Sequence, residues 1–226
     1  MNAIADNLQA VRARISRAAR AARRDDSAVT LLAVSKTHPA ARIAEAQAAG
    51  QRAFGENYVQ EAVEKMTAAP DLEWHLIGPL QSNKTRTVAE RFQWVQTVDR
   101  EKIAKRLSEQ RPAALPALNV LIQVNASGEK TKSGVDPREA EPLARAVAAL
   151  PRLRLRGLMA IPEPGAPRER YAEVRALYDA LKAGYGFDTL SMGMSDDLEL
   201  AVAEGATMVR IGTAIFGARR KEKSAA

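Results

Sequence analysis

The sequence predicts an α/β fold, a single-domain (β/α)8 TIM barrel with one extra helix at the N-terminus. Short apolar runs alternate with longer amphipathic stretches eight times along the chain. Strands that alternate with such helices form parallel βαβ units, and eight units in 226 residues fit a closed barrel. Nothing marks a domain boundary, so residues 1–226 are predicted to form one domain. An open doubly wound sheet is disfavoured, because no G-x-G-x-x-G turn follows the first strand.

The first half of the chain begins its alternation with "VTLLAVS", a Val- and Leu-rich run that suits a buried strand. Each strand leads into a stretch rich in Ala, Glu, Lys and Arg, and Ser82 is a candidate N-cap for one of these helices. Strands are predicted at 29–35, 51–56, 73–78 and 94–99, and helices at 40–49, 58–66, 82–92 and 100–110.

The second half repeats the pattern, and "ALNVLIQVN" is its longest apolar run. The Pro- and Gly-rich residues 161–170 are too few for a linker and are predicted to form a βα-loop. Strands are predicted at 117–125, 153–161, 189–193 and 207–212, and helices at 137–150, 168–184, 195–205 and 213–220.

The extra N-terminal helix is predicted within residues 1–26, where apolar residues recur at helical spacing: Ile4, Leu8, Val11 and Ile15. Six Arg and three Asp share this segment. The stripe favours a helix that caps the barrel with a solvated arginine face. The alternative is a binding module in which this basic helix meets a partner.

Composition excludes several classes of protein. The net charge of +7 is concentrated at the two ends of the chain, and aromatic residues make up only 4%, which disfavours nucleic-acid binding. No apolar run is long enough for a transmembrane helix, and the N-terminus lacks the apolar block of a secretory signal. With no Cys and two His, a metal site is not expected. A cytoplasmic location is the simplest expectation.

Polar residues gather where the predicted strands end, which is where barrels build their active sites. They include Lys36, Asn57, His75, Ser195, Arg210, Gly212 and Thr213. Each also has a structural interpretation: His75 could be a hydrogen-bonded core residue, and Asn57 and Ser195 could be helix N-caps. The convergence of so many on one rim favours a ligand site.

Two features predict that the ligand carries a phosphate and a carbonyl. Gly212 and Thr213 form a strand-to-helix turn where barrels bind phosphate, and free backbone N–H groups there suit an anion. Lys36 ends an apolar strand, so its desolvated amine is expected to have a lowered pKa and to form a Schiff base with a carbonyl. Pyridoxal 5′-phosphate (PLP) and the sugar phosphate of a class I aldolase both fit.

Four segments resemble the pyridoxal-phosphate homeostasis proteins: "LLAVSKTHPA", "FGENYVQEAVEKM", "WHLIGPLQSNK" and "SMGMSDDLELAVAEGATMVRIGTAIFG". The likeness spans about residues 5–218. It implies a barrel similar to the N-terminal domain of bacterial alanine racemase. It also implies a PLP-binding protein of vitamin B6 homeostasis that is not an efficient enzyme.

Carried over by position, the resemblance assigns Lys36 to the Schiff base with PLP. Ser195, Gly212 and Thr213 would hold the phosphate, and Arg210 would face the pyridine nitrogen. Asn57 and His75 would line the rim near the cofactor, and no residue is assigned a catalytic role.

The second domain of alanine racemase, with its tyrosine base, has no counterpart in this sequence, which favours a PLP carrier over a racemase-like or aldolase-like enzyme. It also favours a monomer. PLP-dependent apoenzymes are the expected recipients of the cofactor. A loop that contains Lys130 and Lys132 is expected to lie on the rim, where the two amines could meet an entering or leaving cofactor.

Overall fold

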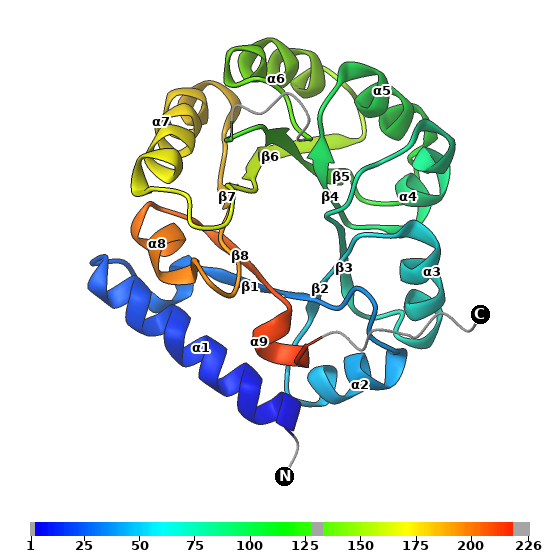
Figure 1. The fold of residues 1–226 in the computed structure, drawn as a ribbon. Helices are drawn as coiled ribbons and strands as arrows, with labels where there is room; N and C mark the ends of the chain where they lie inside the picture. The colour runs from blue at the N-terminus through cyan, green and yellow to red at the C-terminus, as the bar shows by residue number, and fades with distance from the viewer. Residues whose placement is uncertain (1–2, 128–132, 219–226) are drawn as a thin grey trace, which may run out of the picture.

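The structure, a computed structural model, describes residues 3–127 and 133–218. Eight parallel strands close into a barrel in chain order, and helices surround it (Figure 1). The predicted fold class is confirmed. The strands are β1 Thr30–Val34, β2 Ala53–Glu56, β3 Glu73–Leu76, β4 Trp94–Val98, β5 Leu118–Val124, β6 Leu153–Ala160, β7 Thr189–Ser191 and β8 Met208–Ile211.

The α-helices follow the strands and begin with one that precedes them. They are α1 Ala3–Ala21, α2 Ala40–Ala48, α3 Val59–Ala68, α4 Thr85–Arg91, α5 Glu101–Gln110, α6 Ala140–Ala148, α7 Arg168–Tyr185, α8 Leu198–Ala203 and α9 Thr213–Phe216. In the part of the chain that the structure describes, short 3₁₀ helices lie at Asp26–Ala28, Ser82–Lys84 and Pro137–Glu139.

The barrel closes between its first and last strands. In this pairing Leu32 lies opposite Arg210 and Ala33 opposite Ile211. Successive side chains of a strand point to opposite faces. Leu32 accordingly packs in a cluster inside the barrel, whereas Ala33 packs in the larger cluster between strands and helices.

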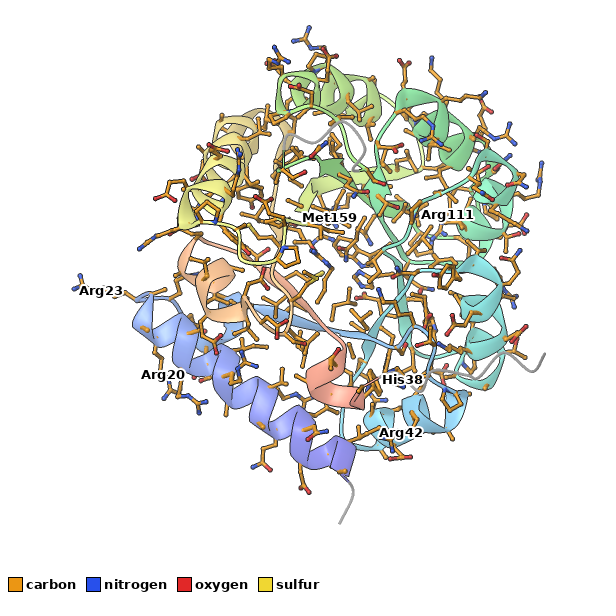
Figure 2. The ribbon with its side chains drawn as sticks, viewed as in Figure 1. Arg20, Arg23, His38, Arg42, Arg111 and Met159 are labelled. Carbon is orange, nitrogen blue, oxygen red and sulfur yellow. The ribbon has the colours of Figure 1, made fainter. Side chains whose placement is uncertain are left out.

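The barrel interior combines two small apolar clusters with buried polar side chains. One cluster contains Leu32, Val34, Ile77 and Met208, and the other contains Trp94, Leu121 and Met159. Met159 lies inside the ring of strands in Figure 2. Gln96, Ser191 and Arg210 are buried among these residues. The interior therefore holds polar groups that need partners, and their hydrogen bonds shape the candidate site.

Helix α1 packs its apolar stripe against the barrel, as the sequence predicts. Its buried residues are Ile4, Leu8, Val11, Ile15, Ala18 and Ala19, and its contacts are chiefly with α8, α9, the 3₁₀ helix Asp26–Ala28 and α2. Asn7 Nδ2 donates to the carbonyl of Ile215 in α9 at 2.9 Å. Arg20 points outward from the helix, and Arg23, just past its C-terminal end, also points away from the barrel (Figure 2). This packing supports the prediction that α1 caps the barrel.

Two helix starts differ from the sequence-based expectation. Ser82 begins a 3₁₀ helix and caps nothing with its side chain. Helix α8 begins at Leu198 rather than near Ser195. The carboxylate of the preceding residue, Asp197, accepts from Met194 N and from the Tyr171 hydroxyl, both at 2.5 Å. Among the described residues, no helix is both long and apolar enough to span a membrane.

Candidate functional site

Lys36 follows β1 at the rim formed by the carboxyl ends of the strands. Leu32 and Val34 point into the barrel, so alternation places Lys36 next in the inward-facing series. Its side chain is half-buried. This agrees with a lysine that leaves the barrel core at the edge of a pocket, rather than one on an outer surface.

A buried ion-pair cluster holds the turn that carries Lys36. Glu56 Oε1 accepts from Ser35 Oγ and from Lys65 Nζ, both at 2.6 Å. Lys65 Nζ also donates to the carbonyl of Ser35 at 2.7 Å and to Glu61 Oε1 at 2.6 Å. Glu61 Oε1 in turn accepts from the backbone N–H of Thr37 at 2.5 Å. Both neighbours of the lysine are therefore fixed by the same group of charges.

Within this cluster, burial and charge pairing act in opposite directions on the pKa of Glu56. Glu56 is fully buried, and burial raises its pKa, while Lys65 beside it acts in the opposite direction. Among the described residues, Glu56 Oε2 has no hydrogen-bond partner. Thr37 has a positive φ of 65°, which a β-branched residue rarely adopts. A backbone in this conformation persists only when its surroundings hold it there.

Two turns that follow β7 and β8 meet beside the end of β1. The N–H of Ala214 is directed at Ser195 Oγ, at 3.4 Å. A Cβ on Gly212 would lie 3.2 Å from the carbonyl oxygen of Val34. The structure therefore brings Ser195, Gly212 and Thr213 together near the turn of Lys36, as an anion pocket requires.

The turn after β7 depends on Gly193. Its φ is +96°, and a Cβ there would lie 2.5 Å from Cβ of Ala201 in α8. Only glycine adopts this conformation at little cost and also leaves room for the helix. The sequence shows this residue within "SMGMS", but gives no sign of its close approach to α8.

Arg210 lies inside the barrel below the rim and is only 4% exposed. Its Nη1 donates to Ser191 Oγ at 2.9 Å, and its Nη2 donates to the carbonyl of Ala160 at 2.8 Å. No carboxylate of the described chain forms an ion pair with it. Burial lowers its pKa to about 10, with Asp197 opposing the shift, so the guanidinium stays charged at neutral pH. It is a donor without acceptor capacity.

His75 does not lie on the rim: its side chain is fully buried in the barrel and stacks on Trp94 with ring centroids 5.0 Å apart. Nε2 contacts Glu73 Oε1 at 2.8 Å, and Nδ1 contacts Gln96 Nε2 at 2.9 Å. Burial lowers its pKa, so the ring is neutral at pH 7. The placement matches the core-histidine interpretation, and a contact between His75 and the cofactor stays a prediction.

Asn57 lines a rim cavity of about 260 Å³. The cavity is bounded by Asn57, Ile77, Pro79, Gln123, Ser133, Ile161, Pro162, Glu163 and Pro164. Among the described residues, the buried Oδ1 of Asn57 has no hydrogen-bond partner. A Cβ on Gly78 would overlap the backbone of Asn57, so β2 and β3 approach closely where they end. Lys130 and Lys132 lie outside the described residues.

Sequence reasoning missed the supporting groups of the site. Lys65 has the pattern of an ordinary exposed helix residue, and Gln96 lies in no motif. Ser191 opens the segment "SMGMS", but nothing in the sequence shows that it contacts Arg210. Glu56 could have been found, because a carboxylate at the end of an apolar strand needs a buried partner.

Comparison with known proteins shows the family to which the chain is similar. The profile of the alanine racemase N-terminal domain matches residues 7–220. The pyridoxal phosphate homeostasis protein of Pseudomonas aeruginosa is 62% identical over 97% of both chains. Its namesake in Escherichia coli is 59% identical, over 99% of this chain and all of the other.

A solved structure of a relative shows the same fold. PipY of Synechococcus elongatus, solved with PLP bound, is 39% identical to this chain and has a TM-score of 0.81. The match covers 95% of this chain and 100% of PipY. The resemblance seen in the four sequence segments is thereby confirmed: the chain belongs to the family of pyridoxal phosphate homeostasis proteins.

Proposed function

We propose that this protein binds PLP through a Schiff base on Lys36 and holds it for PLP homeostasis without efficient catalysis. The observation that carries the proposal is the closure of β8 against β1. It brings the Gly212 turn so close to the end of β1 that a Cβ on Gly212 would lie 3.2 Å from the carbonyl oxygen of Val34, two residues before Lys36. The two neighbouring strands then present a single ligand with the amine of Lys36, after β1, and with the small-residue turn at Gly212, after β8, which suits a phosphate.

The residues present fit the cofactor. Ser195 Oγ and the backbone of Gly212 and Thr213 would hold the phosphate, since all belong to the two turns that meet at the rim. Arg210 would offer its remaining N–H groups to the pyridine nitrogen. Asn57 Oδ1 supplies an acceptor that has no partner in the described protein.

The same residues favour storage over turnover. PLP supplies an aldehyde that an amine can hold and a ring that withdraws electrons, most strongly when its nitrogen is protonated. Arg210 keeps its protons at neutral pH and donates hydrogen bonds without giving up a proton. A nitrogen that faces it stays unprotonated, so the ring withdraws electrons less strongly.

Reduction with borohydride tests the attachment. The purified protein is incubated with PLP, reduced and digested, and the peptides are analysed by mass spectrometry. We expect a pyridoxyl group on Lys36. Its absence from Lys36, or its presence mainly on other lysines, would overturn the proposal.

An enzymatic function is the competing proposal, and turnover tests it. The PLP-loaded protein is incubated with alanine, other amino acids and sugar phosphates. Turnover near the common enzyme value of about 10 s⁻¹ would favour a racemase-like or aldolase-like enzyme. We expect none at that level.

The proposal includes a monomeric protein that acts in the cytoplasm and delivers PLP to dependent apoenzymes. Activation of an apoenzyme by the loaded protein, compared with the same concentration of free PLP, measures this delivery. Equal activation by free PLP would argue against a direct transfer.

A further inference from the structure

A continuous chain of hydrogen bonds crosses the barrel interior from β8 to β3. Arg210 Nη1 donates to Ser191 Oγ at 2.9 Å, and Ser191 Oγ donates to Gln96 Oε1 at 2.7 Å. Gln96 Nε2 donates to His75 Nδ1 at 2.9 Å, and His75 Nε2 lies 2.8 Å from Glu73 Oε1. The chain thus links a buried cation to a carboxylate through three neutral groups.

The direction of every bond in this chain is fixed by its two ends. A guanidinium only donates and a carboxylate only accepts. Gln96 Nε2 also lies 3.2 Å from the sulfur of Met208, which places the amide N–H groups on that side. His75 Nδ1 must then accept, so the proton of the neutral ring sits on Nε2 and is donated to Glu73.

The two ends of the chain lie in different environments. The four groups from Arg210 to His75 are buried, whereas the side chain of Glu73, the first residue of β3, is 46% exposed. The parallel ring of Trp94 holds the imidazole plane of His75. Arg210 is therefore connected to the exposed carboxylate of Glu73 through a row of groups whose orientations are all determined.

We propose that Ser191, Gln96 and His75 are positioning residues that fix the rotation of the Arg210 guanidinium, so that its remaining N–H groups face the cofactor ring. The inference rests on the proposed binding of PLP at Lys36. A guanidinium without a carboxylate partner needs other acceptors to set its plane, and Ser191 Oγ and the carbonyl of Ala160 supply them. Loss of a chain member would let the guanidinium turn away from the cofactor.

The test compares two chain variants with a buried control. Ser191→Ala removes the contact with Arg210, and Gln96→Leu breaks the chain one step further away at nearly constant volume. Ser108→Ala is the control, because Ser108 is also buried and its hydroxyl donates to a backbone carbonyl, that of Pro151 in another part of the fold. Unfolding midpoints, PLP affinity and the visible absorption band of the bound cofactor are measured for each full-length protein.

All three variants are expected to lower the unfolding midpoint. Only Ser191→Ala and Gln96→Leu should shift the absorption band and weaken PLP binding, by about tenfold, which equals about 1.4 kcal/mol. An unchanged band and affinity in both chain variants would overturn the inference while leaving Lys36 labelling intact. Failure of the wild-type protein to label at Lys36 would instead overturn the proposed function.

A measurement without cofactor gives a second readout. The sequence contains two His, so the ¹⁵N spectrum of the imidazoles is simple to assign. The chain predicts that His75 carries its proton on Nε2 and that Gln96→Leu weakens this preference. A proton on Nδ1 in the wild-type protein would contradict the assigned bond directions.

Discussion

Replacement of Lys65 by Met tests how the turn that carries Lys36 is held. The Nζ atom donates three hydrogen bonds, to the carbonyl of Ser35 and to the carboxylates of Glu56 and Glu61, all at 2.6–2.7 Å. Lys65→Met removes them together. The side chain of Glu56 is fully buried, so its charge would be left without a counterion.

The loss of unfolding free energy in Lys65→Met follows from this geometry. Removal of one partner of a buried pair typically destabilises a protein by about 3–5 kcal/mol, because the other charge remains buried. The double variant Glu56→Gln/Lys65→Met removes the stranded charge as well, so it should recover a large part of the loss. Lys105→Met is the control, since Lys105 pairs with Glu101 at the same 2.6 Å distance but on an exposed helix surface.

Urea unfolding followed by circular dichroism at pH 7 measures these differences. PLP affinity should fall in parallel, because the turn would no longer fix Lys36. The reasoning is refuted if Lys65→Met loses no more stability than Lys105→Met, or if the double variant is less stable than Lys65→Met alone.

Three further predictions use the same unfolding assay. Gly193→Ala should cost about 2–5 kcal/mol from its positive φ and its overlap with α8, whereas Gly165→Ala, which has a positive φ but open space, should cost only about 1 kcal/mol; equal costs would contradict the close approach. Burial lowers the pKa of His75 below its ordinary 6.5, so the unfolded chain takes up a proton first as the pH falls. The contribution of neutral His75 to the free energy of unfolding is fully present above pH 6.5. As the pH falls from 7.5 to 5.5, the free energy of unfolding should therefore drop by up to about 1.4 kcal/mol. The drop should shrink in His75→Gln, and a drop that His75→Gln leaves unchanged would assign it to other groups. Leu8→Ala should cost about 2–5 kcal/mol, because Leu8 is 1% exposed against the barrel; a cost below 1 kcal/mol would mean that α1 contributes little.

The order of the elements was predictable, because periodicity is a local property. The first strand was expected at 29–35 and is found at Thr30–Val34, and the stripe that includes Leu8 predicted the buried face of α1. The convergence of Lys36 with the Gly212 turn followed from barrel closure, since first and last strands become neighbours.

Side-chain partners across the barrel were not predictable in the same way. Whether His75 faces the rim or the interior depends on its height along β3 and on Gln96, which comes from another strand. Lys65 is buried only because α3 returns over the end of β1. Such contacts depend on strand register and helix placement, neither of which a single sequence specifies.

The most direct test of the account is a titration of the protein with PLP, followed by the visible absorbance of the Schiff base. Wild-type protein, Lys36→Ala and the exposed-lysine control Lys105→Ala are compared. We expect a band that saturates near one equivalent in the wild-type protein and in Lys105→Ala, and no such band in Lys36→Ala. A band of the same size and saturation in Lys36→Ala would show that the cofactor is held elsewhere.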